Sequence, residues 1–227
     1  MTDRKLIDEQ NDRGARLQLW QNIIDGQREL ELIIDGVFIM ASYNHRSSEL
    51  LIRNTMKHFQ SQNDIDILVG GLGMGFTVKE ACTYPGIKKI DVVEIQPVIV
   101  KWNQEHLYNY NGGCLDDNRV EIIIDDFYDY VTGTDKCYDI ISMDIDNGPM
   151  MLVKADNERV YNLDFFERIK GIVKPGGIFV IWSCNEEPGL LEQTRQVFNE
   201  CYMEEVIDNL HDRAQNDNCI LYYCINS

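Results

Sequence analysis

The sequence predicts an α/β protein: a mostly parallel Rossmann-like sheet with an antiparallel closing strand, preceded by a small antiparallel β meander. Three observations support this fold class. Short β-rich runs alternate with helix-length segments from about residue 65 onward, two Asp-Gly pairs separate apolar runs near the N-terminus, and two strand-like runs follow each other near the C-terminus. Alternation of this kind predicts a sheet covered on both faces, with ligands bound at the carboxyl ends of its strands.

The N-terminal meander is predicted from Asp25-Gly26 and Asp35-Gly36, which lie between apolar or alternating runs. Asp-Gly suits a two-residue type I′ turn, so residues from about 16 to 41 are expected to form antiparallel strands. A helix is expected next over Ser47–Phe59, which places apolar residues near one helical face. We therefore expect an N-terminal β extension over residues 1–45 and a Rossmann-like catalytic domain over residues 46–227.

The main sheet is predicted from five β-rich runs separated by segments long enough for helices. The runs are Ile65–Val69, Lys89–Glu94, Val120–Ile124, Tyr138–Asp144 and Gly177–Ser183. The last two strand-like runs, Met203–Asp208 and Asn218–Ile225, are joined by a polar loop over residues 211–217 with no helical pattern. That arrangement implies an antiparallel closing pair, which an ordinary dinucleotide-binding domain does not require. The expected architecture therefore argues against a nicotinamide cofactor.

Composition limits the class of partner. The chain has 227 residues, with 21 Lys plus Arg, 38 Asp plus Glu and a formal net charge of −17. Such a field repels nucleic acid and anionic membranes and favours a cationic substrate, although it equally serves solubility. The seven cysteines include no C-x-x-C pair, which suggests reduced cytoplasmic thiols rather than a zinc site or disulfides. With a polar N-terminus and no apolar run of membrane-spanning length, the protein is expected to be cytoplasmic, with no nucleic-acid or membrane partner.

The stretch 67–81, ILVGGLGMGFTVKEA, joins an expected strand to an expected helix through a glycine-rich turn. Its glycines are Gly70, Gly71, Gly73 and Gly75. Backbone N–H groups at such a turn attract anions or polar parts of a nucleotide. The dinucleotide fingerprint would require glycine where the chain has Phe76, and the Gly-Lys-Ser/Thr ending of a P-loop is missing. A tight turn without a ligand is the alternative.

Acidic residues follow the next two expected strands. Glu94 is placed to accept hydrogen bonds from both ribose hydroxyls of a nucleoside that lies across the glycine-rich turn. Asp125 or Asp126 is placed to accept a hydrogen bond from an adenine amino group. The alternatives are a solvated acid at a strand end for Glu94 and a helix N-cap for one of the two aspartates.

Asp144 and Asp146 follow the fourth expected strand in the segment DIDNGP. In an extended chain both side chains point to the same side and form a paired anionic site. Two carboxylates can hold a divalent metal, although no further ligand cluster supports one, so no metal site is expected. They can also receive a cationic amine and remove its proton before it attacks an electrophile. Turn chemistry explains Asn147 through Pro149 but gives no reason for Asp144.

This order of motifs resembles the spermidine synthase family, within the class I S-adenosylmethionine-dependent methyltransferase fold, over nearly the whole chain. The family's N-terminal LxLDG-type hairpin matches Leu32–Gly36, and the KPGG segment at Lys174–Gly177 is typical of the superfamily. The resemblance implies that Gly70–Gly75 forms the nucleoside-binding turn. It also implies that Glu94 is the ribose acid, Asp125 the adenine acid and Asp144 the catalytic residue, which deprotonates the attacking amine.

Three departures from the family pattern concern the substrates. The family's turn reads GGGDGG, and the acid that holds the amino group of the donor's aminopropyl chain is replaced here by Gly73. The second aspartate of D-x-x-D-P is replaced by Asn147, with Asp146 one place earlier, and Ser47-Ser48 stands where the family usually has Tyr-Gln. Without an acid at residue 73, the turn also becomes more hospitable to a carboxylate, such as the one that S-adenosylmethionine retains.

The resemblance implies an enzyme of spermidine-synthase-like build. It would bind S-adenosylmethionine or decarboxylated S-adenosylmethionine and transfer a methyl or aminopropyl group to a small, cationic, amine-containing acceptor. Family precedent implies a homodimer. Residues 150–162 are interpreted as a lid, with Lys154 and Arg159 as its cations, or as an ordinary connecting loop. Tyr43 and Trp182 are candidate aromatic faces for a cationic group, but core packing is the more common role of such residues and is the one favoured for Trp182. The alternatives are a non-catalytic nucleoside-binding module and, less favoured, an NAD-dependent oxidoreductase.

Overall fold

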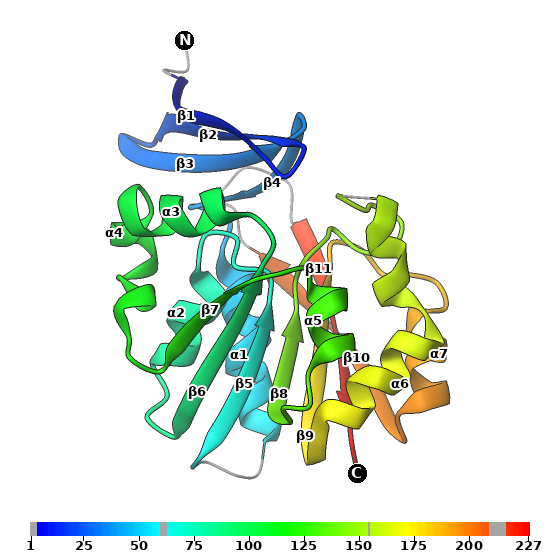
Figure 1. Cartoon of the computed structure of the whole chain (residues 1–227). Helices are drawn as coiled ribbons and strands as arrows, with labels where there is room; N and C mark the ends of the chain where they lie inside the picture. The colour runs from blue at the N-terminus through cyan, green and yellow to red at the C-terminus, as the bar shows by residue number, and fades with distance from the viewer. Residues whose placement is uncertain (1–3, 60–62, 154, 209–216) are drawn as a thin grey trace.

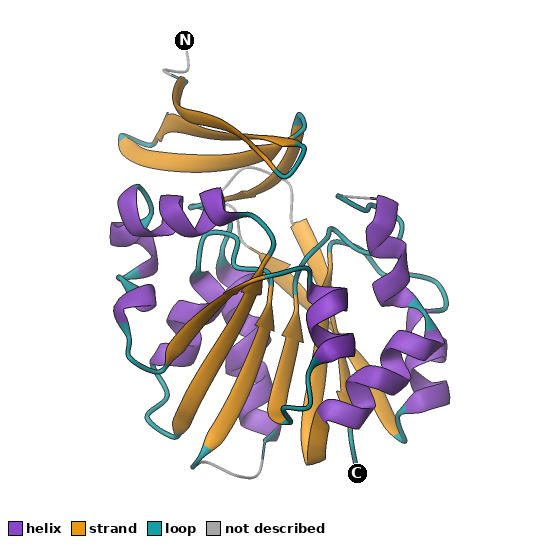
Figure 2. Cartoon of the chain, viewed as in Figure 1, coloured by secondary structure: helices purple, strands orange, loops and turns teal. Residues whose placement is uncertain are grey.

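The computed structural model describes residues 4–59, 63–153, 155–208 and 217–227 and contains two sheets. A four-stranded antiparallel sheet at the N-terminus lies over the end of a seven-stranded sheet toward which the parallel strands point (Figure 1). Helices cover both faces of the larger sheet (Figure 2). The expected α/β fold, with a mostly parallel sheet, an antiparallel closing pair and an antiparallel N-terminal extension, is confirmed.

The N-terminal sheet has the order β1-β2-β3-β4. Its strands are β1 (Lys5–Asp12), β2 (Ala15–Ile24), β3 (Gln27–Ile34) and β4 (Val37–Ala41). Asp25-Gly26 and Asp35-Gly36 both adopt positive φ angles, 51° and 80° in the first pair and 50° and 82° in the second, as the type I′ hairpins require.

The expectation that the meander starts near residue 16 was wrong, because β1 precedes it through a third hairpin at Arg13-Gly14. The sequence of β1, KLIDEQND, has no sustained alternation of apolar and polar residues. This strand is held instead by its backbone pairing with β2 and by the Trp102 indole N–H, which donates to Asp8 at 2.8 Å.

The larger sheet has the order β10-β11-β9-β8-β5-β6-β7. Its strands are β5 (Ile65–Gly70), β6 (Ile87–Glu94), β7 (Val120–Ile124), β8 (Tyr138–Met143), β9 (Val173–Ser183), β10 (Glu200–Asp208) and β11 (Asp217–Ile225). β5 to β9 pair in parallel, whereas β11 is antiparallel to both β9 and β10. Strand order reverses between β5 and β8, which is where such folds bind ligands. The expected loop over residues 211–217 lies outside the described residues except for Asp217, where β11 begins.

Two groups of helices cover the two faces. The helices are α1 (Arg46–His58), α2 (Phe76–Cys82), α3 (Pro97–Glu105), α4 (Tyr108–Asn111), α5 (Phe127–Gly133), α6 (Leu163–Ile172) and α7 (Leu190–Val197), with 3₁₀ turns at Cys114–Asp116 and Ala155–Tyr161. Along β5, Ile67 and Val69 point into the cluster formed with α1, α2 and α3, whereas Leu68 joins the cluster of α5, α6 and α7. Among the described helices, none is long and apolar enough to span a bilayer.

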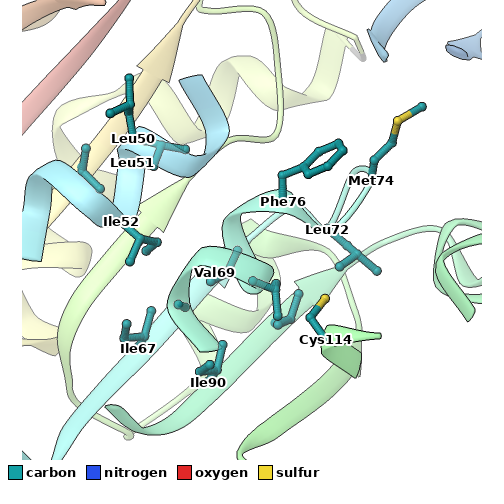
Figure 3. Packing of buried hydrophobic residues seen from close by; sticks show 14 of the residues in the cluster. Leu50, Leu51, Ile52, Ile67, Val69, Leu72, Met74, Phe76, Ile90 and Cys114 are labelled. Atoms are coloured by element: carbon teal, nitrogen blue, oxygen red, sulfur yellow. The ribbon is translucent and has the colours of Figure 1, made fainter. Parts of the chain in front are cut away.

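Figure 3 shows part of the first cluster, to which Leu51 and Ile52 of α1 and Ile67 of β5 all belong. The same cluster extends into the N-terminal sheet through Leu17 and Leu30. Apolar packing thus connects the N-terminal sheet to the larger sheet and holds β4 close to the glycine-rich turn. The division of the chain at residues 45 and 46 stays a prediction.

Candidate active site

A cavity of about 600 Å³ lies at the carboxyl ends of β5, β6, β7 and β8. Its volume suits a nucleoside with a short chain and a small second molecule. Most of the residues expected at the site line it: Gly71, Gly73, Glu94, Asp125, Asp126, Asp144 and Asp146. Gly70 and Gly75 are not among the lining residues. A Cβ at Gly70 would meet the Phe127 ring at 2.6 Å, and Gly75 is the N-cap of α2 with φ 84°. These two glycines therefore allow the backbone conformation and packing of the turn without lining the cavity.

The glycine-rich turn needs glycine for two different reasons. Gly71 adopts φ +87°, and a Cβ there would collide with the backbone carbonyl oxygen of Asp144. Gly73 adopts φ +51°, and a Cβ there would lie 2.6 Å from the sulfur of Met40. Left-handed backbone favours glycine at both positions. The turn is therefore packed between the end of β8 on one side and the N-terminal sheet on the other.

Met40 of β4 contributes to the site in a way that sequence reasoning missed. Its thioether sulfur accepts a hydrogen bond from the Met74 backbone N–H at 3.1 Å and lies beside Gly73. It also lines the cavity. A methionine in a short apolar strand normally signals core packing, so the sequence around Met40 carried no sign of this contact. An aliphatic thioether thus lies next to Gly73, where the resemblance described above implies an acid.

Glu94 ends β6 and is 5% exposed. Its Oε2 accepts the Leu72 backbone N–H at 3.0 Å, and its Oε1 accepts the Gln96 backbone N–H at 2.8 Å. Burial raises the pKa of Glu94, while these backbone N–H groups act in the opposite direction. Each carboxylate oxygen has a second lone pair, so Glu94 can still accept hydrogen bonds from ligand hydroxyls. The solvated-acid alternative is therefore wrong for the position that Glu94 occupies.

Asp125 and Asp126 follow β7 and are used differently. Asp126 is the N-cap of α5, where it accepts the backbone N–H of Tyr128 at 2.9 Å, and it pairs with Arg159 at 2.7 Å. Asp125 Oδ1 accepts the Asp126 N–H at 2.9 Å. Both side chains line the cavity. The capping alternative that the sequence left open thus applies to Asp126, and Asp125 is the better placed of the two to bind a ligand.

Asp144 follows β8, and its backbone N–H donates to the Gly70 carbonyl oxygen at 3.0 Å. Its carboxylate is hydrogen-bonded by the Ser48 hydroxyl from the first turn of α1. Burial, helped by the negative charge of Asp146, raises the pKa of Asp144 to about 7, and the Ser48 hydrogen bond opposes that rise. A carboxylate with such a pKa can accept and hold a proton near neutral pH.

Asp146 is 5% exposed, and its Oδ1 accepts the Val153 backbone N–H at 2.6 Å. Asp146 also lines the cavity, as Asp144 does. Its hydrogen bond with Val153 fixes the start of the segment over residues 150–162. Among the residues that the structure describes, no three His, Cys, Asp or Glu side chains lie together as a metal site.

The segment over residues 150–162 borders the cavity with Met151, Val153, Asn157 and Val160. Arg159 pairs with Asp126 and stacks on the Tyr128 ring at 4.4 Å, which ties this segment to α5. The other cation expected in this segment, Lys154, lies outside the described residues.

The two aromatic candidates lie in different places. Trp182 of β9 lines the cavity, so it is positioned to face a ligand. Tyr43 is not among the lining residues, and its hydroxyl donates to Glu31 of β3 at 3.0 Å. Core packing was the role favoured for Trp182, and Trp182 does pack against the first cluster, but it also lines the cavity. Tyr43 contacts the N-terminal sheet instead.

Comparison with known proteins gives a consistent result. The chain matches the spermine/spermidine synthase domain over residues 45–206. It is 28% identical to a polyamine aminopropyltransferase of Sulfolobus acidocaldarius over 64% of this chain and 47% of that protein. It is 30% identical to a polyamine aminopropyltransferase of Aeropyrum pernix over 66% of this chain and 46% of that protein. The chain thus spans about half the length of these two curated relatives.

Solved structures show the same fold at low identity. The spermidine synthase of Thermotoga maritima matches with a TM-score of 0.78 and 16% identity, over 98% of this chain and 73% of the other. A spermidine synthase in complex with the transition-state analogue AdoDATO matches with a TM-score of 0.77, the same identity and the same coverage of both chains. At 16% identity these likenesses establish the fold, and the chemistry has to be argued from the residues of the cavity.

Proposed function

Because the chain belongs to the spermine/spermidine synthase family, we propose that it is an aminopropyltransferase. The proposed donor is decarboxylated S-adenosylmethionine, and the proposed acceptor is an amine of a small polyamine. The named curated relatives are aminopropyltransferases, which favours aminopropyl transfer over methyl transfer. The homodimer and the cytoplasmic location stay predictions.

The charge of the cavity is the observation that carries this proposal. Five carboxylates line it, namely Glu94, Asp125, Asp126, Asp144 and Asp146, and none of its described lining residues is Lys, Arg or His. One of the five, Asp126, is paired with Arg159. Decarboxylated S-adenosylmethionine has a sulfonium and an ammonium group, whereas S-adenosylmethionine adds a carboxylate that this cavity would repel. Gly73 alone favoured a donor with a carboxylate, but the charge of the whole lining favours the decarboxylated donor.

The donor's nucleoside is assigned to the residues that follow β5, β6 and β7. The Gly70–Gly75 turn lets the ligand approach the backbone, Glu94 accepts hydrogen bonds from the ribose hydroxyls, and Asp125 accepts one from the adenine amino group. Burial and backbone hydrogen bonds hold Glu94 in place before the ligand arrives. This geometry orients the sulfonium toward Asp144, and such positioning supplies much of the rate in a displacement reaction.

The transfer step uses Asp144 as the base. An acceptor amine enters largely as ammonium, and Asp144 takes one of its protons, which frees the nitrogen lone pair. The nitrogen then attacks the aminopropyl carbon attached to sulfur. A C–N bond forms and the C–S bond breaks, with its electron pair left on sulfur, so neutral methylthioadenosine leaves and the product nitrogen carries the positive charge. Asp146 lies near Asp144 in the cavity lining, where its negative charge attracts the cationic acceptor.

The proposal is tested by incubating the purified protein with decarboxylated S-adenosylmethionine and, separately, 1,3-diaminopropane, putrescine or spermidine. Mass spectrometry is expected to find methylthioadenosine together with an aminopropylated amine. S-adenosylmethionine is offered in parallel, because formation of S-adenosylhomocysteine would instead identify a methyltransferase. Nucleoside binding without turnover on any amine would favour the non-catalytic module, and binding of NAD alone would contradict the proposal.

A further inference from the structure

One buried polar side chain at the cavity makes no hydrogen bond with the described part of the protein. Gln96 lies between β6 and α3, is 2% exposed and lines the cavity two residues after Glu94. Within the described part of the chain, neither its side-chain Oε1 nor its Nε2 has a hydrogen-bond partner. We propose that Gln96 is a second residue that recognises the ribose hydroxyls of the donor, together with Glu94. This inference rests on the proposed nucleoside donor.

Local structure does not explain the amide. Gln96 occupies the N-cap position of α3, but its side chain makes no capping hydrogen bond. Its backbone N–H is the group that serves the fold, because it donates to Glu94 Oε1 at 2.8 Å. Any residue other than proline would supply that N–H. An apolar side chain at residue 96 would therefore serve the folded protein at least as well.

Energetics make such an amide unusual. Burying an amide without hydrogen bonds costs free energy, and nearly all buried polar groups in proteins have a partner. Gln96 lies in the wall of a cavity large enough for a nucleoside, so a bound ligand can supply both missing partners. The ligand group then has to donate one hydrogen bond and accept another, which a hydroxyl group does.

The chemistry of a ribose ring matches the two side chains. Glu94 as a carboxylate only accepts hydrogen bonds, so it binds hydroxyl hydrogens and leaves the hydroxyl oxygens without a donor. The Gln96 Nε2 group supplies such a donor, and its Oε1 accepts from a hydroxyl that Glu94 does not fully engage. The backbone bond between Gln96 and Glu94 keeps the two side chains adjacent. Together they recognise a ribose diol and discriminate against deoxynucleosides.

The test uses Gln96→Met, which keeps the side-chain length and removes both polar atoms. Calorimetry measures the affinity of wild type and variant for methylthioadenosine and for its 2′-deoxy and 3′-deoxy forms. The variant is expected to bind methylthioadenosine about 5- to 20-fold more weakly, as the loss of one or two neutral hydrogen bonds implies. For at least one deoxy form, wild type and variant are expected to bind equally, because the hydroxyl that Gln96 contacts is already missing.

Thermal unfolding without ligand separates this role from a structural one. Gln96→Met is expected to unfold at the same temperature as wild type or higher, because it removes an unpaired buried amide. Gln104→Met, on the exposed face of the same helix, is the matched control and is expected to bind all three nucleosides like wild type. Gln96→Leu provides the same comparison if the methionine variant does not fold.

Three results would overturn the inference: unchanged methylthioadenosine affinity in Gln96→Met, an equal loss for all three nucleosides, or a lower unfolding temperature without ligand. Failure of the wild type to bind methylthioadenosine is a different result. It would overturn the proposed nucleoside donor and this inference with it. Binding by wild type with no effect of Gln96→Met would overturn this inference alone.

Discussion

The two ends of the cavity contain buried acids in different surroundings. The donor end, defined as Gly70–Gly75, Glu94 and Asp125, places Glu94 against several backbone N–H groups, those of Gln96 and Leu72 foremost, which oppose the effect of burial on its pKa. The acceptor end, defined as Asp144, Asp146 and residues 150–162, places Asp144 against one serine hydroxyl and a second carboxylate. Burial, helped by the charge of Asp146 and opposed by the Ser48 hydrogen bond, raises the pKa of Asp144 to about 7. This difference fits the proposed roles, in which the donor end binds the nucleoside and the acceptor end exchanges a proton.

The largest expected effect comes from Asp144→Asn, which tests the acceptor end. The substitution keeps the volume of the side chain but removes the base, so turnover should fall by about 10²–10⁴-fold. Donor affinity should stay nearly unchanged, because the nucleoside is held at the other end. Single-turnover rates and calorimetry on the same preparation measure the two quantities. Full activity in the variant would move the catalytic role to another residue.

The stability of the same variant checks that it folds. It also tests whether the ionised Asp144 carboxylate destabilises the folded protein. The pKa of Asp144 is raised in the folded state, so its contribution to stability is present below the unfolded value and is lost as pH rises through about 7. Asp144→Asn removes this cost and should gain roughly 1–4 kcal/mol over wild type at pH 8, with little gain near pH 4. Chemical denaturation at both pH values measures the difference, and a gain of equal size at both would contradict the assigned cause.

Gly71→Ala tests the contact between the two ends. Alanine at residue 71 would keep a strained positive φ and would collide with the Asp144 carbonyl oxygen, so the folded state should lose about 2–4 kcal/mol. Gly112→Ala is the matched control, since Gly112 has φ +66° and open space around its Cβ, and should cost only about 1 kcal/mol. Urea unfolding compares the two variants, and equal losses would show that the close approach to Asp144 is unimportant.

Glu94→Gln tests the donor end with a somewhat smaller effect. The amide keeps the shape of the side chain but weakens its charge-assisted bonds to ribose hydroxyls, so donor affinity should fall by ~1.5–3 kcal/mol. The transfer rate of bound donor should change much less. Calorimetry with methylthioadenosine measures the affinity, and an unchanged value would leave Glu94 with a purely structural role in the turn.

Asp146→Asn should have the smallest effect on activity. Its proposed role is to attract the cation and raise the pKa of Asp144, so turnover should fall by less than the 10²-fold lower bound expected for loss of the base. An amide oxygen can still accept the Val153 N–H, which preserves the start of the 150–162 segment. Single-turnover rates of Asp146→Asn and Asp144→Asn, measured side by side, show which substitution reduces turnover more. A larger loss for Asp146→Asn would exchange the roles of the two aspartates.

The donor end could be read from the sequence because its signals are local. A strand that ends in glycines, and acids at the ends of the next strands, identify Gly71, Glu94 and Asp125 without knowledge of the packing. The Asp-Gly turns likewise identified three of the four N-terminal strands. β1 was missed because its polar sequence gives no strand pattern and its position depends on pairing with β2.

The features that sequence reasoning missed depend on distant parts of the chain. Met40 reaches Gly73 only because the N-terminal sheet packs over the turn, and the Arg159–Asp126 pair joins the N-cap of α5 to the segment over residues 150–162. Gln96 becomes informative only when its burial and its unpaired amide are known. The pKa of Asp144 depends on burial and on Ser48 from α1, which no local pattern around Asp144 indicates.

The most direct test of the account is the pH dependence of transfer compared with that of donor binding. The single-turnover rate of wild type with decarboxylated S-adenosylmethionine should fall as pH drops through about 7, because Asp144 must be unprotonated to accept the proton of the amine. In Asp144→Asn this inflection should disappear, and methylthioadenosine affinity should show no inflection near pH 7 in either protein. An inflection that persists in Asp144→Asn, or one shared by nucleoside binding, would contradict the separation of a binding end from a proton-transfer end.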